Sequence, residues 1–391
     1  MSARLASRPF LLLGAQLLAV SVIVALFFPL QLYLESLGIS PAAAGFILGA
    51  DALAALVVQA GLTPVISART ARRWLIAGAL VLALALVCEG VATRAPTLAA
   101  ARLLQGAGFI AIVTALLPLL VLCIPRERSG EAFGWISLIR LVPYAVIPPL
   151  FELFQLTPAA LGLVLRWAAP VALLPILLLV FLPVFPQEKE PAAAAGLGGV
   201  GQSLREGWLR RLLGATLLVY AAYAITFFFL KGLARQSGFT GSGLFFTLAT
   251  LVMLGTRLAG GPWFDRYNKS RLTAGALGVA ALATGALAWF PGGPVWFLLA
   301  VGCGLGWGVA MPLLNALAFG FSRPDARGLN QNLVFLAIQG GFFLGPWLGG
   351  GLLAHLGYPA LFLATGVVWL LAAFLIWPLG REEARPMPPP T

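Results

Sequence analysis

The chain has 391 residues, of which 60% are hydrophobic and only 10% are charged. A composition this apolar lies outside the range of soluble domains of this length, so the sequence predicts a protein embedded in a lipid bilayer. The formal net charge of +12 would suggest a nucleic-acid partner in a soluble protein, but here the basic residues fall mainly in short gaps between apolar stretches, and we expect no nucleic acid.

Twelve apolar segments follow one another along the chain, and a helix needs about 20 apolar residues to cross a bilayer. The first six lie near 10–34, 42–68, 74–92, 97–123, 131–154 and 159–183. Six more lie near 212–233, 241–263, 272–290, 295–321, 328–354 and 358–379. Between the two sets, residues 185–211 combine Pro191 with alanine-rich and glycine-rich stretches, which is typical of a linker. The predicted domains are therefore 1–184 and 212–391, joined by the linker 185–211.

The basic residues alternate between the loops, and short cytoplasmic loops are the ones that retain Lys and Arg. They crowd the N-terminus, every second loop and the tail: Arg4, Arg8, Arg69, Arg72, Arg73, Arg126, Arg128, Arg266, Lys269, Arg271, Arg323, Arg327, Arg381 and Arg385. The intervening loops offer only Arg94 and Arg235. This pattern predicts cytoplasmic termini, a cytoplasmic linker and an integral protein of the plasma membrane. The composition, rich in Ala, Leu and Arg, favours the inner membrane of a bacterium.

Matching positions in the two sets of segments indicate an internal repeat. Gly61 and Arg69 have the same mutual spacing as Gly261 and Lys269. A second pair recurs in the fifth and eleventh segments: Gly130 with Pro148, and Gly328 with Pro346. The sequence therefore predicts two homologous halves of six segments each.

The connection after the eighth segment, which we predict to be a short basic loop, carries the pattern Gly261-x-x-x-Asp265-Arg266-x-x-Lys269. This pattern resembles the loop signature of the major facilitator superfamily, with Asn268 where the family usually has glycine. The resemblance implies that Asp265 clamps a neighbouring helix end and loop arginines in the outward-facing state. A helix N-terminus attracts such a negative charge. The alternative is a solvated loop charge.

A second motif is Arg102 with Gln105 and Gly106, early in the fourth segment. It is similar to a pattern that many members of the superfamily use for proton coupling. The resemblance extends over 10–379 and implies an all-α membrane protein of twelve transmembrane helices. These helices form two pseudo-symmetric six-helix halves, with the substrate site near the midplane between them.

A third motif lies in the eleventh segment: Gly345, Pro346 and Gly349. It is similar to a motif that antiporters of the superfamily carry in the fifth helix. The fifth segment here reads Pro148-Pro149 instead, so the resemblance favours the superfamily more than its antiporter branch. Glycine and proline at these positions allow close helix packing and gating bends.

Charged residues inside predicted membrane segments are expensive and tend to mark substrate or proton paths. Asp51 is the leading candidate for a proton-binding carboxylate, and the alternative is a structural ion pair with Arg102 or Arg140. Arg140, near mid-depth in the fifth segment, is expected to bind substrate or to form an ion pair. The long stem of Arg102 could also extend to the interface. Other charges lie nearer the outer ends, where gate salt bridges and interfacial anchoring fit equally: Glu35, Glu89, Glu152, Arg166 and Lys231.

The second half contributes mostly uncharged polar side chains. Tyr223 of the seventh segment, Asn315 of the tenth and Gln339 of the eleventh are the candidates for hydrogen bonds to a substrate. The alternative is that they hold the helices to one another.

We interpret the sequence as a secondary active transporter that moves a small organic solute by alternating access. An arginine in the cavity favours an anionic or zwitterionic solute, and Asp51 with Arg102 indicates coupling to protons. A multidrug or sugar efflux antiporter and a lipid flippase on the same scaffold remain alternatives. An enzyme would need converging acid, base or metal-binding side chains, whereas His355 is the only histidine and the three cysteines have no metal-ligand spacing. We expect a monomer without cofactor or metal.

Overall fold

A computed structural model describes residues 7–62, 70–124, 129–182 and 197–383. In these ranges the regular structure consists of α-helices and one short 3-10 helix, and no strand occurs. Helices follow from the composition, because a helix satisfies its own backbone hydrogen bonds where water is absent. The chain divides into two compact units.

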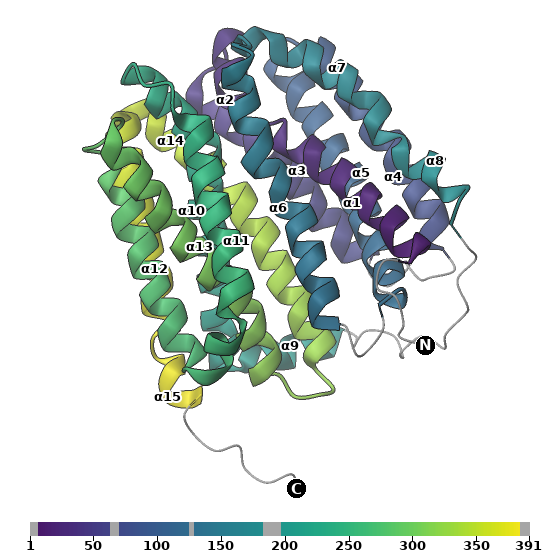
Figure 1. Cartoon of the computed structure of the whole chain (residues 1–391), viewed down its shortest axis with the longest axis vertical. Coiled ribbons are helices and arrows are strands. Elements are labelled where there is room, and N and C mark those ends of the chain that lie inside the picture. The colour runs from purple at the N-terminus through teal and green to yellow at the C-terminus, as the bar shows by residue number, and fades with distance from the viewer. Residues whose placement is uncertain (1–6, 63–69, 125–128, 183–196, 384–391) are drawn as a thin grey trace, which may run out of the picture. The chain divides into compact units, whose positions relative to one another are not determined.

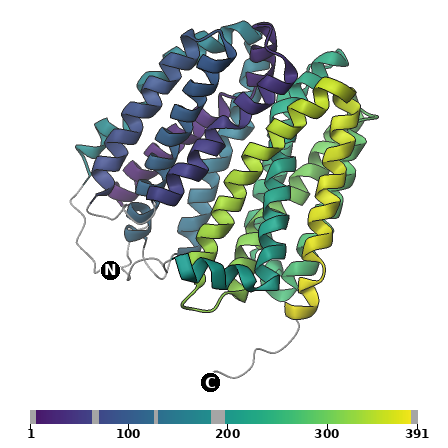
Figure 2. The same ribbon diagram turned by 180° about the vertical axis from the view of Figure 1, so that it is seen from behind.

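Unit 1 comprises Met1–Ala193 and two short pieces, Ser242–Thr247 and Pro346–Ala354. Figure 1 and Figure 2 show its helices running side by side. They are α1 (Arg8–Ala25), α2 (Leu30–Ser36), α3 (Pro41–Leu62), α4 (Ala71–Val91), α5 (Ala95–Leu122), α6 (Ser129–Leu153), the 3-10 helix η2 (Pro158–Ala160), α7 (Leu161–Ala172) and α8 (Leu174–Leu179). α5 packs against both α3 and α4, and α4 packs against α7 and α8.

Unit 2 comprises Ala194–Gly241, Leu248–Gly345 and His355–Thr391. Its helices are α9 (Leu197–Arg205), α10 (Gly207–Gln236), α11 (Ser242–Arg266), α12 (Lys269–Ala286), α13 (Pro294–Phe321), α14 (Arg327–Ile376) and α15 (Leu379–Glu383). The first turns of α11 and a stretch of α14 thus belong to unit 1. Within unit 2, α12 packs along α13 and also contacts α15.

α14 is interrupted at Gly357, where φ is 76° and ψ is 179°. A positive φ of this size is strained for residues with a Cβ atom and is readily adopted by glycine. The helical turns before and after Gly357 correspond to the predicted segments near 328–354 and 358–379.

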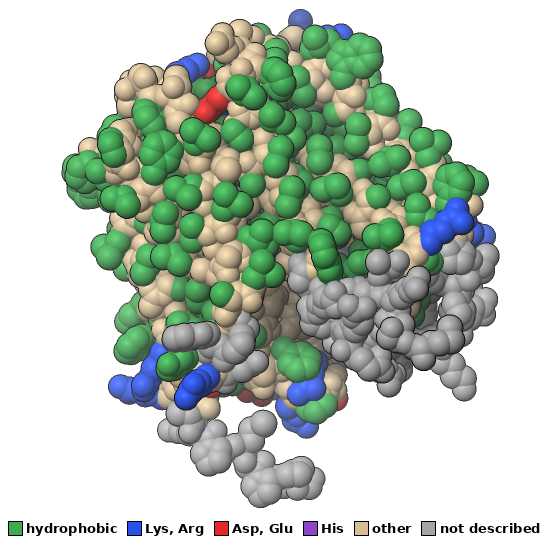
Figure 3. Space-filling view, in the orientation of Figure 1, with side chains coloured by type: hydrophobic (Ala, Val, Ile, Leu, Met, Phe, Trp, Pro, Cys, Tyr) green, Lys and Arg blue, Asp and Glu red, His purple; other side chains and the backbone are tan. Residues whose placement is uncertain are grey.

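Ten helices of the described ranges are long and apolar enough to cross a membrane. α14 counts once among them although Gly357 divides it. α12 is not among the ten, and its first turn carries Lys269 and Arg271, which lower its hydropathy. On the face shown in Figure 3, hydrophobic side chains are spread across the middle of the described surface, and Lys and Arg lie at its margins. Such a surface is typical of a protein that lies in a bilayer.

Proline divides the first predicted segment. The helix expected near 10–34 ends as α1 at Ala25 and resumes as α2 at Leu30. Pro29 lies in the intervening turn, and proline both lacks a backbone N–H and disfavours a helical conformation in the residue before it.

Two stretches are more helical than the sequence predicted. The prediction that Asp265 and Arg266 lie in a loop is wrong, because α11 continues to Arg266. The side chain of Asn268 then caps α12 by accepting a hydrogen bond from the N–H of Arg271 at 2.9 Å, so a short connection suffices. Within the range 185–211 that was predicted as a linker, the structure has α9 and the start of α10.

α3 and α5 approach each other closely at Gly106. A Cβ atom at this position would lie 2.6 Å from the Cα of Asp51. α4 and α5 meet in a similar way, since a Cβ on Gly78 would lie 2.9 Å from the carbonyl oxygen of Gly108. Small residues allow membrane helices to pack backbone to backbone.

Gly106→Ala should therefore destabilise the protein by about 1–3 kcal/mol, the usual cost of overpacking a tight contact. The melting temperature of the purified protein in detergent measures the effect. Gly275→Ala on α12 is the matched control, because a Cβ there meets no atom within 4 Å. Equal melting temperatures for the two variants would contradict the close contact.

Candidate functional site

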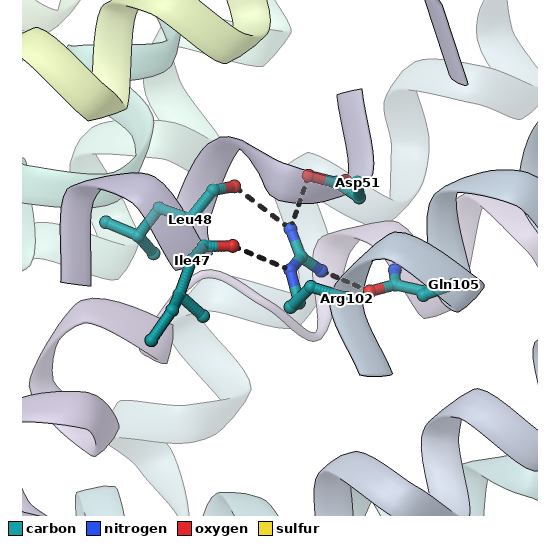
Figure 4. A network of polar contacts seen from close by, with 5 residues as sticks. All are labelled: Ile47, Leu48, Asp51, Arg102 and Gln105. Atoms are coloured by element: carbon teal, nitrogen blue, oxygen red, sulfur yellow. Dashed lines mark hydrogen bonds and ion pairs between the residues drawn. The ribbon is translucent and has the colours of Figure 1, made fainter. Parts of the chain in front are cut away.

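A buried guanidinium joins α5 to α3 in unit 1 (Figure 4). Arg102 is 1% exposed, and its Nη2 atom lies 2.7 Å from Oδ1 of Asp51. The same Nη2 donates to the carbonyl oxygen of Leu48 at 3.1 Å, and Nε donates to that of Ile47 at 3.3 Å. Nη1 donates to the side-chain oxygen of Gln105. Each guanidinium nitrogen therefore has an acceptor.

The helical period explains how one arginine meets these acceptors. Arg102 and Gly106 are four residues apart and share a face of α5, and Gly106 brings that face against the backbone of Asp51. A helical carbonyl oxygen has a second lone pair, so α3 can accept from Arg102 and keep its own hydrogen bonds. The guanidinium carbon also lies 4.4 Å from the centre of the Phe27 ring, a cation–π contact. The side chain of Arg102 is thus buried and does not extend to the interface.

Arg140 lies near the middle of α6, about 16 Å from its start at a rise of 1.5 Å per residue. Its side chain is exposed, and it forms no ion pair within the described residues. Tyr144, one turn further along α6, is under the electrostatic influence of both Arg140 and Asp51. Of the two partners considered for Asp51, the structure pairs it with Arg102. The side chain of Asp51 is 28% exposed.

Glu152, at the end of α6, caps the first turn of α11 inside unit 1. Its Oε1 accepts a hydrogen bond from the N–H of Gly243 at 2.8 Å and another from the hydroxyl of Ser242. The hydroxyl of Thr247 adds a bond to the carbonyl oxygen of Ala145 at 2.6 Å. A helix N-terminus carries partial positive charge, which favours a carboxylate there. Within the described residues Glu152 is therefore a helix cap with neutral partners and forms no salt bridge.

The candidates in the second half lie in unit 2. The ring of Tyr223 on α10 contacts two others edge-on, with centroids 4.9 Å from Trp307 on α13 and 6.1 Å from Phe342 on α14. Gln339 lies three residues before Phe342 on α14 and is buried. Asn315 on α13 is exposed, and its side chain donates to a carbonyl oxygen one turn back in its own helix at 3.1 Å. Tyr223 thus has an aromatic environment, while Asn315 uses part of its hydrogen-bonding capacity locally.

The motif between α11 and α12 is only partly described. Gly261 and Asp265 lie in the last turns of α11, and the expected clamp by the Asp265 side chain falls outside what the structure describes. Arg266 is exposed and Lys269 begins α12. The N–H groups of Lys269 and of the next residue donate to the two carboxylate oxygens of Glu383, each at 2.9 Å. The acid that caps this helix in the structure is therefore Glu383 of α15.

The glycine and proline motif of α14 packs against helices in each unit. In unit 2, a Cβ on Gly345 would lie 2.7 Å from the Cα of Ala221 on α10. In unit 1, the carbonyl oxygen of Pro346 lies against Gly45 of α3. Gly349 is buried. Close packing is the role of this motif that the structure displays.

Sequence reasoning did not single out two contacts of this site. Gln105 lies one turn from Arg102, a spacing at which helical side chains meet, so that signal was available. Phe27 lies in the turn between α1 and α2, and nothing in the sequence relates it to Arg102. In the described ranges no group of three or more His, Cys, Asp or Glu could hold a metal ion.

The fold and the buried ion pair define an integral membrane protein with several membrane-crossing helices and charge in its interior. Residues 10–330 match the Major Facilitator Superfamily, so the chain belongs to this family of membrane transporters.

Several solved structures have the same fold. A mutant of the nucleoside transporter NupG has a TM-score of 0.80 at 12% identity, with 97% of this chain and 100% of that one covered. A bacterial homologue of the human lysosomal transporter Spinster, inward-facing and unoccupied, has a TM-score of 0.76 at 14% identity, with 99% and 100% covered. The human organic anion transporter MFSD10 has a TM-score of 0.68 at 17% identity, with 94% and 99% covered. At these identities the likeness concerns the fold alone.

Part of the chain is also similar to a transporter of Escherichia coli (strain K12), the 3-(3-hydroxy-phenyl)propionate transporter. The two are 34% identical over 138 residues, which are 34% of this chain. The match spans about a third of that relative, 33% of its length.

Replacing Arg102 by lysine should strongly destabilise unit 1, because an ammonium cannot reproduce the planar fork that reaches acceptors on α3 and α5. We expect a loss of about 3 kcal/mol, the low end for breaking a buried ion pair. Thermal unfolding in detergent measures it, with the exposed Arg94→Lys as control. Arg102→Lys with the stability of the wild type would show that the bonds to α3 contribute nothing.

Proposed function

We propose that this protein is a secondary active transporter that moves a small organic anion or zwitterion across the membrane by alternating access. Arg140 is the observation that carries the proposal: it is exposed, lies near the middle of α6 and forms no ion pair within the described residues. A cation at this depth is expensive against lipid and is tolerated where it faces a water-filled cavity. A solute that enters such a cavity meets an uncompensated positive charge.

The chemistry of arginine selects the class of solute. A guanidinium binds a carboxylate through two parallel charge-assisted hydrogen bonds, which fix orientation as well as supply affinity. Asp51 is already paired with Arg102 at 2.7 Å, so it leaves the charge of Arg140 for a ligand.

The relative from Escherichia coli supports one kind of anion. Its name describes a substrate with a phenyl ring and a propionate group. In this chain Tyr223, Trp307 and Phe342 form an aromatic group whose edge and face contacts also suit a ligand ring. We therefore propose aromatic carboxylates as the first substrates to test.

We further propose twelve membrane crossings in two six-helix halves, 1–184 and 212–391, joined by residues 185–211. Ten candidate helices, the break of α14 at Gly357 and the 18 residues of α12 support this number. The alternation of basic residues between loops supports cytoplasmic termini and the inner membrane of a bacterium. We expect the monomer to be the transporting unit.

Coupling to protons is part of the proposal and rests on Asp51 and Arg102. A carboxylate that gains a proton releases its arginine partner, so protonation can change which contacts hold α3 and α5 together. In this scheme Asp51→Asn should lose the response of transport to a pH gradient, which uptake into proteoliposomes measures. A normal response in that variant would remove Asp51 from the coupling scheme.

The proposed anion site is tested by the thermal stability of the full chain with 3-phenylpropionate and with its neutral amide. A ligand that binds the native state raises the melting temperature by mass action. We expect the carboxylate, and not the amide, to raise the melting temperature of the wild type. In Arg140→Ala the carboxylate should no longer raise it. Arg94→Ala, which removes an exposed arginine at the start of α5, should keep it. A shift that survives Arg140→Ala would overturn the role of Arg140.

A further inference from the structure

The carboxyl group of Glu89 is buried without a hydrogen bond. The residue is 1% exposed, and neither of its carboxylate oxygens has a partner within the described residues. Glu89 lies near the end of α4, a helix apolar enough to cross the membrane. Asp51 and Glu152, by contrast, both accept bonds from nearby donors. An ionised carboxylate without donors is strongly disfavoured in an apolar interior, whereas a neutral carboxylic acid is tolerated.

The ionisable groups around Glu89 come from the helices packed about it. Arg102 of α5 and Asp51 of α3 both act on it electrostatically. Tyr33 of α2 is under the influence of Glu89 and of Arg166 on α7. Arg166 packs against α4 at the residue after Glu89, because its Cγ atom would clash with a Cβ on Gly90. α8, which also packs against α4, carries no ionisable side chain.

In unit 1 the two carboxyl groups lie on different helices, Asp51 on α3 and Glu89 on α4. α5 packs against both α3 and α4, so Arg102 lies on the helix that the two acid-bearing helices share. The guanidinium is bound to Asp51, and these two charges balance. A negative charge on Glu89 would then have no buried partner. A carboxyl group that is buried without a cation or a hydrogen-bond donor keeps its proton, because burial disfavours its charged form.

We propose that Glu89 is a proton-binding site, and that Glu89 and Asp51 exchange as partners of Arg102. Glu89 holds the proton while Asp51 is paired with Arg102. When Arg102 turns to Glu89, that carboxyl releases its proton and Asp51 takes one up. The use of this exchange in transport rests on the proposed function, whereas the protonation of Glu89 does not.

The test uses the full chain in detergent and requires no substrate. Wild type, Glu89→Gln and the control Glu35→Gln, whose side chain is exposed, are melted over a series from mildly acidic to alkaline pH. A carboxyl group that holds its proton in the folded protein makes stability fall as pH rises through its titration. We expect this fall in the wild type and in Glu35→Gln, and its loss in Glu89→Gln. The same fall in Glu89→Gln as in the wild type would overturn the proposal.

A second measurement needs no variant and therefore does not depend on the folding of Glu89→Gln. Dicyclohexylcarbodiimide adds to protonated carboxyl groups in apolar surroundings, and mass spectrometry of the labelled wild type identifies the carboxyl that carried the proton. We expect modification of Glu89 and not of Asp51. Modification of Asp51 and not of Glu89 would reverse the assignment. Absence of 3-phenylpropionate uptake by the wild type would instead count against the transport function, and leaves both results on Glu89 interpretable.

Discussion

The ion pair between Arg102 and Asp51 is the interaction on which the interior of unit 1 depends. A cation inside a membrane protein is stable only where acceptors replace its water, and here α3 and α5 supply all of them. This requirement explains the glycine at position 106, since any side chain there would separate the two helices. It also restricts movement, because sliding α3 along α5 would break the bonds to the carbonyl oxygens of Ile47 and Leu48.

Charge and aromatic surface are distributed unequally between the two units. Unit 1 carries the interior ionisable residues Asp51, Glu89 and Arg102 and the exposed Arg140. The candidates in unit 2 are neutral, and Tyr223 is surrounded by rings. In the proposed mechanism, proton exchange and recognition of the carboxylate both belong to unit 1.

The apolar runs and the loop motif were sufficient to predict the helical class and the superfamily. The pairing of Asp51 with Arg102 was among the alternatives, because each is the one charged residue of its predicted membrane segment. The burial of Glu89 was missed. In a soluble helix the hydrophobic period marks the inward face, but a membrane helix such as α4 is apolar all round, so the sequence does not show which way a side chain points. The last three residues of α11 were missed because the cap at Asn268 permits a connection shorter than a typical loop.

Glu383 has a consequence for the order in which the protein folds. It caps α12 from 114 residues later in the chain, so the leading N–H groups of α12 have no carboxylate partner until Glu383 has been synthesised. α12 leaves the ribosome long before α15, so the cap of α12 forms only after α15 has also been made. A stop codon just before Glu383 would yield a chain that retains the helices up to α14 but leaves the first N–H groups of α12 without their carboxylate.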